Sequence, residues 1–231
     1  MKTKYRVFLL GGNSLIGDAV LNGIKLRYEN VEVIKFVRNK NSTDENIFQV
    51  ESYKDSINRI ESIVDDDKKN IYILSFGVLN EENRHQDLLK NLQNHIEINA
   101  YDNLFLFQRI KDLKNFHEIH IVSSVLSGFF RPSAGSYSIS KYILSKALNI
   151  EVFLNEKLKN KLFIWNPAFI DSNLNQNRKS VLIKTSSKKI TKKVTSKSKG
   201  GNYYIPSYSF LFVKLASLFE FLIFKVDKKV N

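Results

Sequence analysis

The chain has 231 residues, 43% of them hydrophobic, which is enough for one large domain with a full core. It contains no cysteine, which excludes disulfides and thiolate metal sites, and its four histidines lack zinc-ligand spacing, so we expect no bound metal. The net charge of +13 is compatible with phosphorylated ligands, an anionic membrane surface or nucleic acid, but no nucleic-acid-binding motif accompanies it.

The first forty residues predict a strand, a glycine turn, a helix and a second strand. The apolar run 5–10 leads directly into a turn between Gly11 and Gly17, and a helix is predicted over about 14–28. A second strand is predicted over 31–37, which completes a βαβ unit and opens a parallel sheet. The positions expected to be buried on the helix are Leu15, Ala19, Leu21, Ile24 and Leu26.

The same alternation of strand and helix continues along the chain. Further strands are predicted at 48–50, 71–74, 119–122, 162–165 and 203–205. Further helices are predicted at 52–65 (with Ile57, Ile60 and Ile63 inward), 87–111, 136–156 and about 186–198, the last capped by Ser186 or Ser187. The pattern predicts a single α/β domain: a Rossmann-like doubly wound parallel sheet with helices on both faces.

The glycine turn has the position of a dinucleotide site. A backbone without side chains can approach a pyrophosphate closely, and the amides of Gly12, Asn13 and Ser14 and the following helix N-terminus favour anions. The alternative is an ordinary strand-to-helix turn. The second strand ends at Arg38 rather than at Asp or Glu, and a guanidinium suits a 2′-phosphate, so NADPH is preferred and NADH remains open. The alternative is that Arg38 is a solvated loop cation.

A Tyr-x-x-x-Lys pair follows the strand at 119–122. If Tyr137 opens a helix, Lys141 lies one turn further on the same face, and a nearby ammonium favours the phenolate. Such a tyrosine can exchange a proton with a carbonyl or alcohol near neutral pH. Ser124, at the end of the strand, can hydrogen-bond the same oxygen. The alternative is a common surface pair.

Over residues 5–171 these motifs together resemble the short-chain dehydrogenase/reductase family. The turn 10–17 is similar to the glycine motif of that family, with either Leu15 or Ser14 in place of one glycine. Ser124 stands thirteen positions before Tyr137, the spacing of the substrate-orienting serine of the family, with Ser123 as a fallback.

Three further segments carry the resemblance. The segment 75–77 keeps only the glycine of the Asn-Ala-Gly motif of the family, Asn99 matches the asparagine of the helix that follows it, and 166–171 resembles the segment that closes over the nicotinamide.

The resemblance implies hydride transfer between a nicotinamide and a substrate carbon. It makes Tyr137 the general acid or base, with Lys141 lowering its pKa and contacting the nicotinamide ribose, Ser124 orienting the oxygen and Asn99 maintaining a water path. The predicted cofactor contacts are Gly11, Asn13, Ser14, Leu15, Ile16, Gly17, Arg38, Ser75, Phe76, Gly77, Tyr137, Lys141, Pro167, Phe169 and Ile170. A small-molecule carbonyl or alcohol is the expected substrate. Relatives are often dimers or tetramers, so we expect a homodimer or homotetramer.

The C-terminal region is basic and aromatic. We divide the chain into a core (1–171), a substrate-covering region with the last strand (172–206) and an apolar C-terminal helix (207–231). Two charges interrupt that helix, so it is not expected to span a membrane; it packs on the body, packs on a second subunit, or makes peripheral membrane contact through 207–225. Lysines flank it at Lys192, Lys193, Lys197, Lys199, Lys225, Lys228 and Lys229.

The tail is also similar to that of family members that reduce lipid-linked keto-sugars. This resemblance suggests reduction of a keto group on a nucleotide- or lipid-linked sugar, in the carbohydrate biosynthesis of surface glycans. The alternative is a catalytically silent nucleotide-binding regulatory or scaffold protein with the same fold. The start of the chain does not resemble a signal peptide, so the expected location is cytoplasmic, with the inner face of the membrane as an option.

Overall fold

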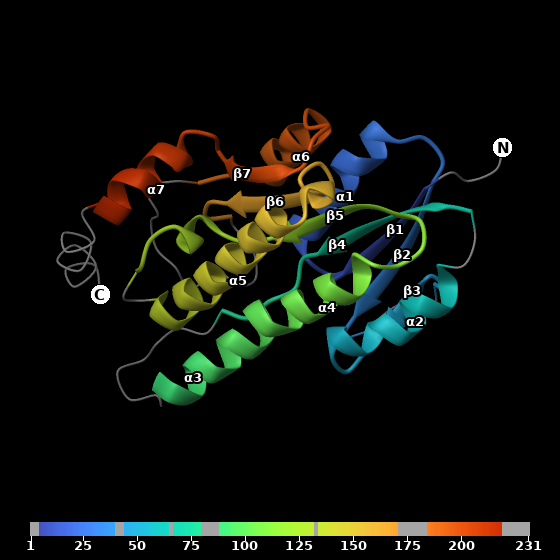
Figure 1. Ribbon diagram of the computed structural model, residues 1–231, viewed down its shortest axis with the longest axis horizontal. Helices are drawn as coiled ribbons and strands as arrows, with labels where there is room; N and C mark the ends of the chain where they lie inside the picture. Colours follow the sequence, from blue (N-terminus) through green and yellow to red (C-terminus); the bar gives the residue numbers. More distant parts are fainter. Residues whose placement is uncertain are drawn as a thin grey trace.

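The structure, a computed structural model, describes residues 5–39, 44–64, 67–79, 88–131, 134–170 and 184–218. Within them seven strands form one sheet in the order β3-β2-β1-β4-β5-β6-β7, and every neighbouring pair is parallel (Figure 1). The strands are β1 (Tyr5–Leu10), β2 (Val31–Val37), β3 (Ile47–Gln49), β4 (Lys69–Leu74), β5 (Phe116–Val122), β6 (Leu162–Pro167) and β7 (Gly201–Ile205). The strand order reverses between β1 and β4, so a ligand crevice is expected at their carboxyl ends.

Helices cover both faces of the sheet, as the sequence predicts. Figure 1 and the two core clusters place α2, α4 and α5 on one face and α1 and α6 on the other. The helices of the described chain are α1 (Leu15–Arg27), α2 (Ser56–Ile63), α3 (Leu88–His95), α4 (Asp102–Ile110), α5 (Gly135–Leu154), α6 (Ser187–Thr195) and α7 (Ser209–Leu218). The predicted fold class, a doubly wound α/β sheet, is therefore confirmed.

The core explains why α1 packs as it does. Its buried arc centres on Val20 and Ile24 and includes the predicted Ala19 and Leu21. The predictions for Leu15 and Leu26 were wrong, because these side chains are 43% and 70% exposed. With 3.6 residues per turn, both positions fall just outside the buried arc, on the side beyond Ala19.

Several element boundaries differ from the sequence prediction for local reasons. The helix predicted over 52–65 begins as a 3₁₀ turn (Tyr53–Asp55) with Ser52 and Asp55 forming a capping box, and becomes α-helical at Ser56. Ile57 and Ile60 are buried as predicted, whereas Ile63 is half-buried.

The helix predicted over 87–111 is interrupted by a π-helical turn, η2 (Ile96–Tyr101), between α3 and α4.

The C-terminal elements differ from the prediction at their ends. The helix predicted to 198 ends at Thr195, and Ser186 caps its start by accepting a hydrogen bond from the Lys189 amide at 3.4 Å. The apolar helix begins at Ser209 and is described to Leu218. Among the described residues, no helix has the length and apolar character needed to cross a bilayer. Residues 171–183, which include the first part of the predicted substrate-covering region, and 219–231 lie outside the described residues.

Candidate functional site

The glycine turn joins the end of β1 to α1 beside the ends of β2 and β4. Gly11 has a φ of +90°, which favours glycine, and a Cβ there would lie 2.9 Å from the amide nitrogen of Phe76. The amides of Gly11 and Gly12 both donate to the Phe36 carbonyl, at 3.1 and 2.9 Å, which holds the turn against β2. Asn13 extends this link, because its Nδ2 donates to the Asn39 carbonyl at 3.2 Å.

Helix α1 presents its N-terminus at this turn. Ser14 is the N-cap, and its Oγ accepts a hydrogen bond from the Gly17 amide at 3.1 Å. Gly17 must be small, because a Cβ there would collide with the Ser75 hydroxyl. As the first helical residues, Leu15 and Ile16 have amides with no acceptor inside the helix, so this end attracts an anion.

The segment after β4 closes the other side of the turn. Ser75 donates from its amide to the Leu10 carbonyl at 2.9 Å, and its Oγ lies 3.1 Å from the same oxygen. Phe76, by contrast, points into the core and stacks on Tyr53 with 4.5 Å between ring centroids. Arg38 is exposed and reaches the Tyr53 hydroxyl. Burial raises the pKa of Tyr53, although the charge and hydrogen bonds of Arg38 oppose this. Arg38 is therefore held at the edge of the crevice.

Tyr137 and Lys141 lie in the first two turns of α5, which begins at Gly135. The Lys141 Nζ lies 5.8 Å from the centre of the Tyr137 ring. Lys141 is 3% exposed, Tyr137 is half-buried, and the ammonium donates to the Val122 carbonyl at the end of β5, at 3.3 Å. Burial lowers the pKa of Lys141 from 10.5 to about 8. Among the described residues, no carboxylate forms an ion pair with it.

Asn99 joins this pair from the π-helical turn. Its side chain is fully buried and forms two hydrogen bonds with the Val78 backbone: Oδ1 accepts from the amide at 2.8 Å and Nδ2 donates to the carbonyl at 2.9 Å. The same Nδ2 lies 3.1 Å from the Ser140 Oγ of α5. A Cβ on Gly77 would lie 2.7 Å from the Asn99 Oδ1 and 3.6 Å from the Lys141 Nζ. The structure therefore brings 77, 99 and 141 together.

Ser124 follows β5 and caps the 3₁₀ turn at Val125–Ser127, where its Oγ accepts from the Leu126 amide at 3.2 Å. Its neighbour Ser123 is buried, and the Ser123 Oγ has no hydrogen-bond partner within the described chain. Ser124 keeps a hydroxyl proton to donate, because the cap uses only its oxygen, as an acceptor.

The segment after β6 forms the last side of the crevice. The Ala168 amide donates to the Ile205 carbonyl at 2.8 Å, and the Thr185 amide donates to the Phe169 carbonyl at 2.9 Å. Pro167 is the last residue of β6, and Ile170 is buried in the cluster shared with α1 and α6. Phe169 and Ile170 thus lie at the carboxyl edge of the sheet.

Sequence reasoning missed two groups that support the site. His95 of α3 is fully buried, with its ring edge-on to Tyr137 at 6.3 Å and its Nδ1 donating to the Asn91 carbonyl at 2.8 Å. Ser140 donates to the Tyr137 carbonyl at 2.8 Å while it accepts from Asn99. His95 lies four residues before Asn99 on a helical stretch, and this spacing was the available signal.

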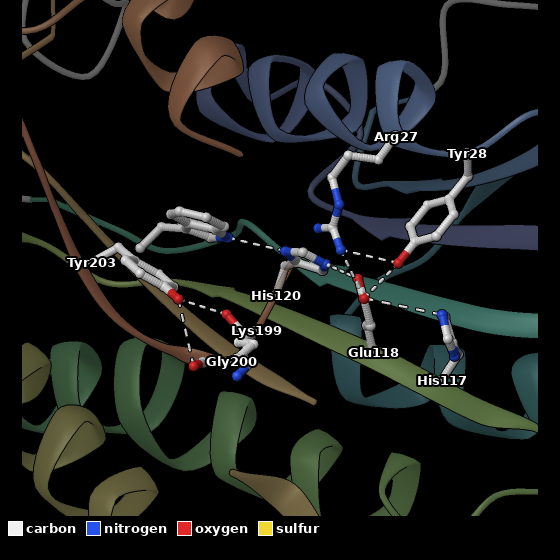
Figure 2. A network of polar contacts seen from close by, with 9 residues as sticks. Arg27, Tyr28, His117, Glu118, His120, Lys199, Gly200 and Tyr203 are labelled. Carbon is white, nitrogen blue, oxygen red and sulfur yellow. Dashed lines mark hydrogen bonds and ion pairs between the residues drawn. The ribbon is translucent and has the colours of Figure 1, made fainter. Parts of the chain in front are cut away.

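A second polar cluster lies at the amino end of the sheet (Figure 2). Arg27 and Tyr28, at the end of α1, donate to one oxygen of Glu118 at 2.9 and 2.6 Å. His120 Nε2 lies 3.1 Å from the other oxygen, and Trp165 Nε1 donates to His120 Nδ1 at 3.1 Å, so the imidazole is neutral with its proton on Nε2.

The charges of this cluster are compensated. Burial opposes ionisation of Glu118, but hydrogen bonds from His120 and Tyr28 and the charge of Arg27 lower its pKa to about 2. Burial also lowers the pKa of His120, which agrees with the neutral tautomer. Because Glu118 lies near the start of β5 and Lys141 contacts its end, the cluster is separate from the candidate site.

Several solved structures of dehydrogenases and reductases have a similar arrangement of strands and helices. A short-chain dehydrogenase from Burkholderia cenocepacia in complex with NADP matches with a TM-score of 0.73 at 16% identity, over 96% of this chain and 97% of that one. An aldohexose dehydrogenase from Thermoplasma acidophilum matches at 0.67 and 14%, over 90% and 89%. A 3-oxoacyl-[acyl-carrier protein] reductase from Brucella melitensis in complex with NAD matches at 0.68 and 14%, over 92% and 94%.

These similarities show that the chain has the same fold as these dehydrogenases and this reductase, and they cover nearly the full length of both chains in each comparison. No protein-family model matches the sequence, and no curated protein sequence matches it.

Proposed function

We propose that this protein is a nicotinamide-dependent oxidoreductase of the short-chain dehydrogenase/reductase family that interconverts a carbonyl and an alcohol. The observation that carries the proposal is the Lys141 ammonium, buried beside the Tyr137 ring without a carboxylate partner among the described residues. Burying an uncompensated charge costs stability, and such arrangements concentrate at functional sites. Here the charge lies at the carboxyl ends of parallel strands, where ligands bind in folds of this type.

The residues around the glycine turn fit a dinucleotide. A Cβ at Gly11 or Gly17 would fill the approach between the turn and Ser75, and the helix N-terminus at Leu15 and Ile16 offers amides to a pyrophosphate. The reduced nicotinamide supplies the hydride, and this chain supplies binding and proton transfer. The other predicted cofactor contacts lie along the same edge of the sheet: Gly77, Pro167, Phe169, Ile170 and the backbone of Phe76, whose side chain points into the core.

Proton transfer is assigned to Tyr137. During reduction its phenol donates the proton that converts the forming alkoxide to an alcohol, and during oxidation its oxygen accepts that proton. The Lys141 ammonium, largely protonated at neutral pH because its pKa is about 8, stabilises the negative charge left on the phenol oxygen. Ser124 donates a hydrogen bond to the substrate oxygen. Asn99 holds the Val78 backbone and the α5 residue Ser140, and thereby fixes the geometry around the ammonium.

The preference for NADPH rests on Arg38. It stands at the end of β2, tied to the turn through Asn13 and Asn39, and it reaches Tyr53 beside the crevice. A guanidinium there suits a 2′-phosphate. Replacing Arg38 by Gln should weaken the competition of 2′,5′-ADP with NADPH binding about tenfold or more, and it should leave the competition of 5′-AMP almost unchanged. The matched control is Arg59→Gln on α2; equal losses for both nucleotides would refute the preference.

The substrate is proposed to be a polar carbonyl compound, such as a keto group on a nucleotide- or lipid-linked sugar. Two structural neighbours at 14% and 12% identity are described as an aldohexose dehydrogenase and a putative gluconate dehydrogenase, which favours a hydroxyl-rich ligand. The division of the chain into 1–171, 172–206 and 207–231, the assembly into a homodimer or homotetramer, and the cytoplasmic location stay predictions.

The decisive experiment separates binding from turnover. NADPH binding is measured by its fluorescence, and NADPH consumption is followed with a panel of aldoses, keto-sugars and 3-oxoacyl thioesters. Tyr137→Phe should abolish consumption and keep NADPH binding within about twofold, because the ring is retained and only the hydroxyl group is lost. Tyr142→Phe, on the exposed side of the same helix, is the control. Binding without consumption by the unmodified protein would favour the silent scaffold alternative, and consumption that survives Tyr137→Phe would refute the assigned role.

A further inference from the structure

The edge of the molecule formed by α6, β7 and α7 has an unusual charge distribution. Residues 184–218, which build it, contain eight lysines and neither aspartate nor glutamate. Figure 1 shows α6 and α7 on either side of β7, the last strand of the sheet. Positive charge without any local acid gives this edge a field that attracts anionic surfaces.

One face of α7 anchors the helix to the loop that follows Ser124. Val213 and Ala216 are buried, and Val213 packs so closely on Gly128 that a Cβ there would collide with it. Phe212 packs edge-on against Phe129 of the same loop, with 5.7 Å between ring centroids. The orientation of α7 is therefore fixed by contacts on one side.

The opposite face of α7 exposes large apolar side chains. Leu211, Leu215 and Leu218 are 63%, 49% and 71% exposed, and Phe210 and Tyr208 add two aromatic rings. The leucines recur at spacings of four and three residues, so they form one stripe along the helix. Lys214 lies within that stripe, with its ammonium 5.2 Å from the Phe210 ring. A long lysine chain can keep its charge in water while its stem covers apolar surface.

The lysine edge and the apolar stripe adjoin. Lys193 of α6 donates from Nζ to the Ser207 hydroxyl at 2.7 Å, just before α7 begins. The pKa of Lys193 is lowered by burial and, to a smaller extent, by the charge of nearby Lys197. We propose that this face, made of the α7 stripe and the lysines of α6, docks peripherally on an anionic lipid bilayer. The leucines enter the interface and the lysines contact the acidic headgroups.

Charge favours a bilayer over a second copy of the chain. A two-fold contact through α7 would place two lysine-rich, acid-free edges against each other, and like charges across an interface oppose association. An anionic bilayer complements both the charge and the apolar stripe. Because α7 covers the loop that begins after Ser124, docking would bring the candidate site to the membrane surface.

The test is flotation of the full chain with vesicles of phosphatidylcholine alone and of phosphatidylcholine mixed with phosphatidylglycerol. The unmodified protein should float with the mixed vesicles and much less with the neutral ones. Leu211→Gln combined with Leu215→Gln should lower the bound fraction about tenfold, since each lost side chain removes exposed apolar area from the interface. The matched control is Phe153→Gln with Leu154→Gln, two exposed apolar residues of α5.

A charge series completes the test. Replacing Lys188, Lys189 and Lys192 by Gln should also lower binding about tenfold, because each lysine contributes near an anionic surface. The same change at Lys146, Lys157 and Lys159, which are exposed elsewhere, should have little effect. Circular dichroism confirms that each variant is folded. Absence of flotation, equal losses in the controls, or a protein whose α7 variant changes from dimer to monomer without any change in flotation would overturn the proposal.

Discussion

Replacing Lys141 by methionine should stabilise the fold while removing the candidate activity. Burial lowers the lysine pKa from 10.5 to about 8, and this difference corresponds to about 3 kcal/mol at neutral pH. Methionine keeps a similar volume but loses the hydrogen bond to the Val122 carbonyl, which contributes about 1 kcal/mol. The net gain in the free energy of unfolding is therefore about 2 kcal/mol, and an increase in the midpoint temperature of about 5 °C is expected.

The pH dependence tests the cause of this gain. Because the pKa is lower in the folded state, the unfolded chain binds more protons between pH 8 and 10.5, and the stability of the unmodified protein rises with pH across that window. The advantage of Lys141→Met, measured by urea denaturation, should therefore shrink as the pH rises from 8 to 10.5. Lys146→Met, at an exposed position of the same helix, should show no such trend. A variant less stable than the parent at pH 7, or a constant difference at all pH values, would refute the reasoning.

Three other substitutions probe the remaining structure. Glu118→Gln should lower the free energy of unfolding by about 3 kcal/mol at pH 7, since it leaves buried partners uncompensated, whereas Glu151→Gln should cost less than about 1 kcal/mol. With its pKa near 2, the Glu118 carboxylate stabilises the fold above about pH 4.5 and loses this effect as the pH falls, so urea midpoints should converge in acid. Gly11→Ala should weaken NADPH binding measured by fluorescence about tenfold or more, and unchanged binding would contradict the close approach described at that turn. Asn99→Ala should lower the midpoint temperature by several degrees, because the Val78 amide and carbonyl both lose their partner, and an unchanged midpoint would argue against these hydrogen bonds.

The fold could be predicted because its strands are nearly continuous apolar runs. Burial on both faces leaves little ambiguity in segments such as 5–10 and 162–167, whose ends the sequence placed within two residues. The candidate pair of Tyr137 and Lys141 was placed correctly on one helix, since a spacing of four defines a common face. Both predictions depend on local periodicity, which a sequence contains in full.

Features that depend on distant partners could not be predicted. The π-helical turn has no local signal; it places Asn99 where its side chain reaches Val78, twenty-one residues away. The stacking of Tyr53 on Phe76 likewise joins residues from separate elements. The prediction that Leu26 is buried was wrong because a helical pattern shows only which residues share a face. The width of the buried arc of α1 depends on how α6 packs against it, which the pattern does not contain.

Two buried charges lie at opposite ends of β5: Glu118 near its start, and the ammonium of Lys141, a residue of α5, against its last residue. They show how the same fold treats structure and site differently. At the amino end, Glu118 receives hydrogen bonds from Tyr28 and Arg27. These bonds lower the free-energy cost of burying its carboxylate. At the carboxyl end, the Lys141 ammonium donates to one backbone carbonyl among the described residues and has a strongly lowered pKa. A protein selected only for stability would replace that lysine, as the methionine variant tests. An ammonium left with unused donors can still bind a ligand, so the cost is consistent with a site whose missing partners are supplied by cofactor and substrate.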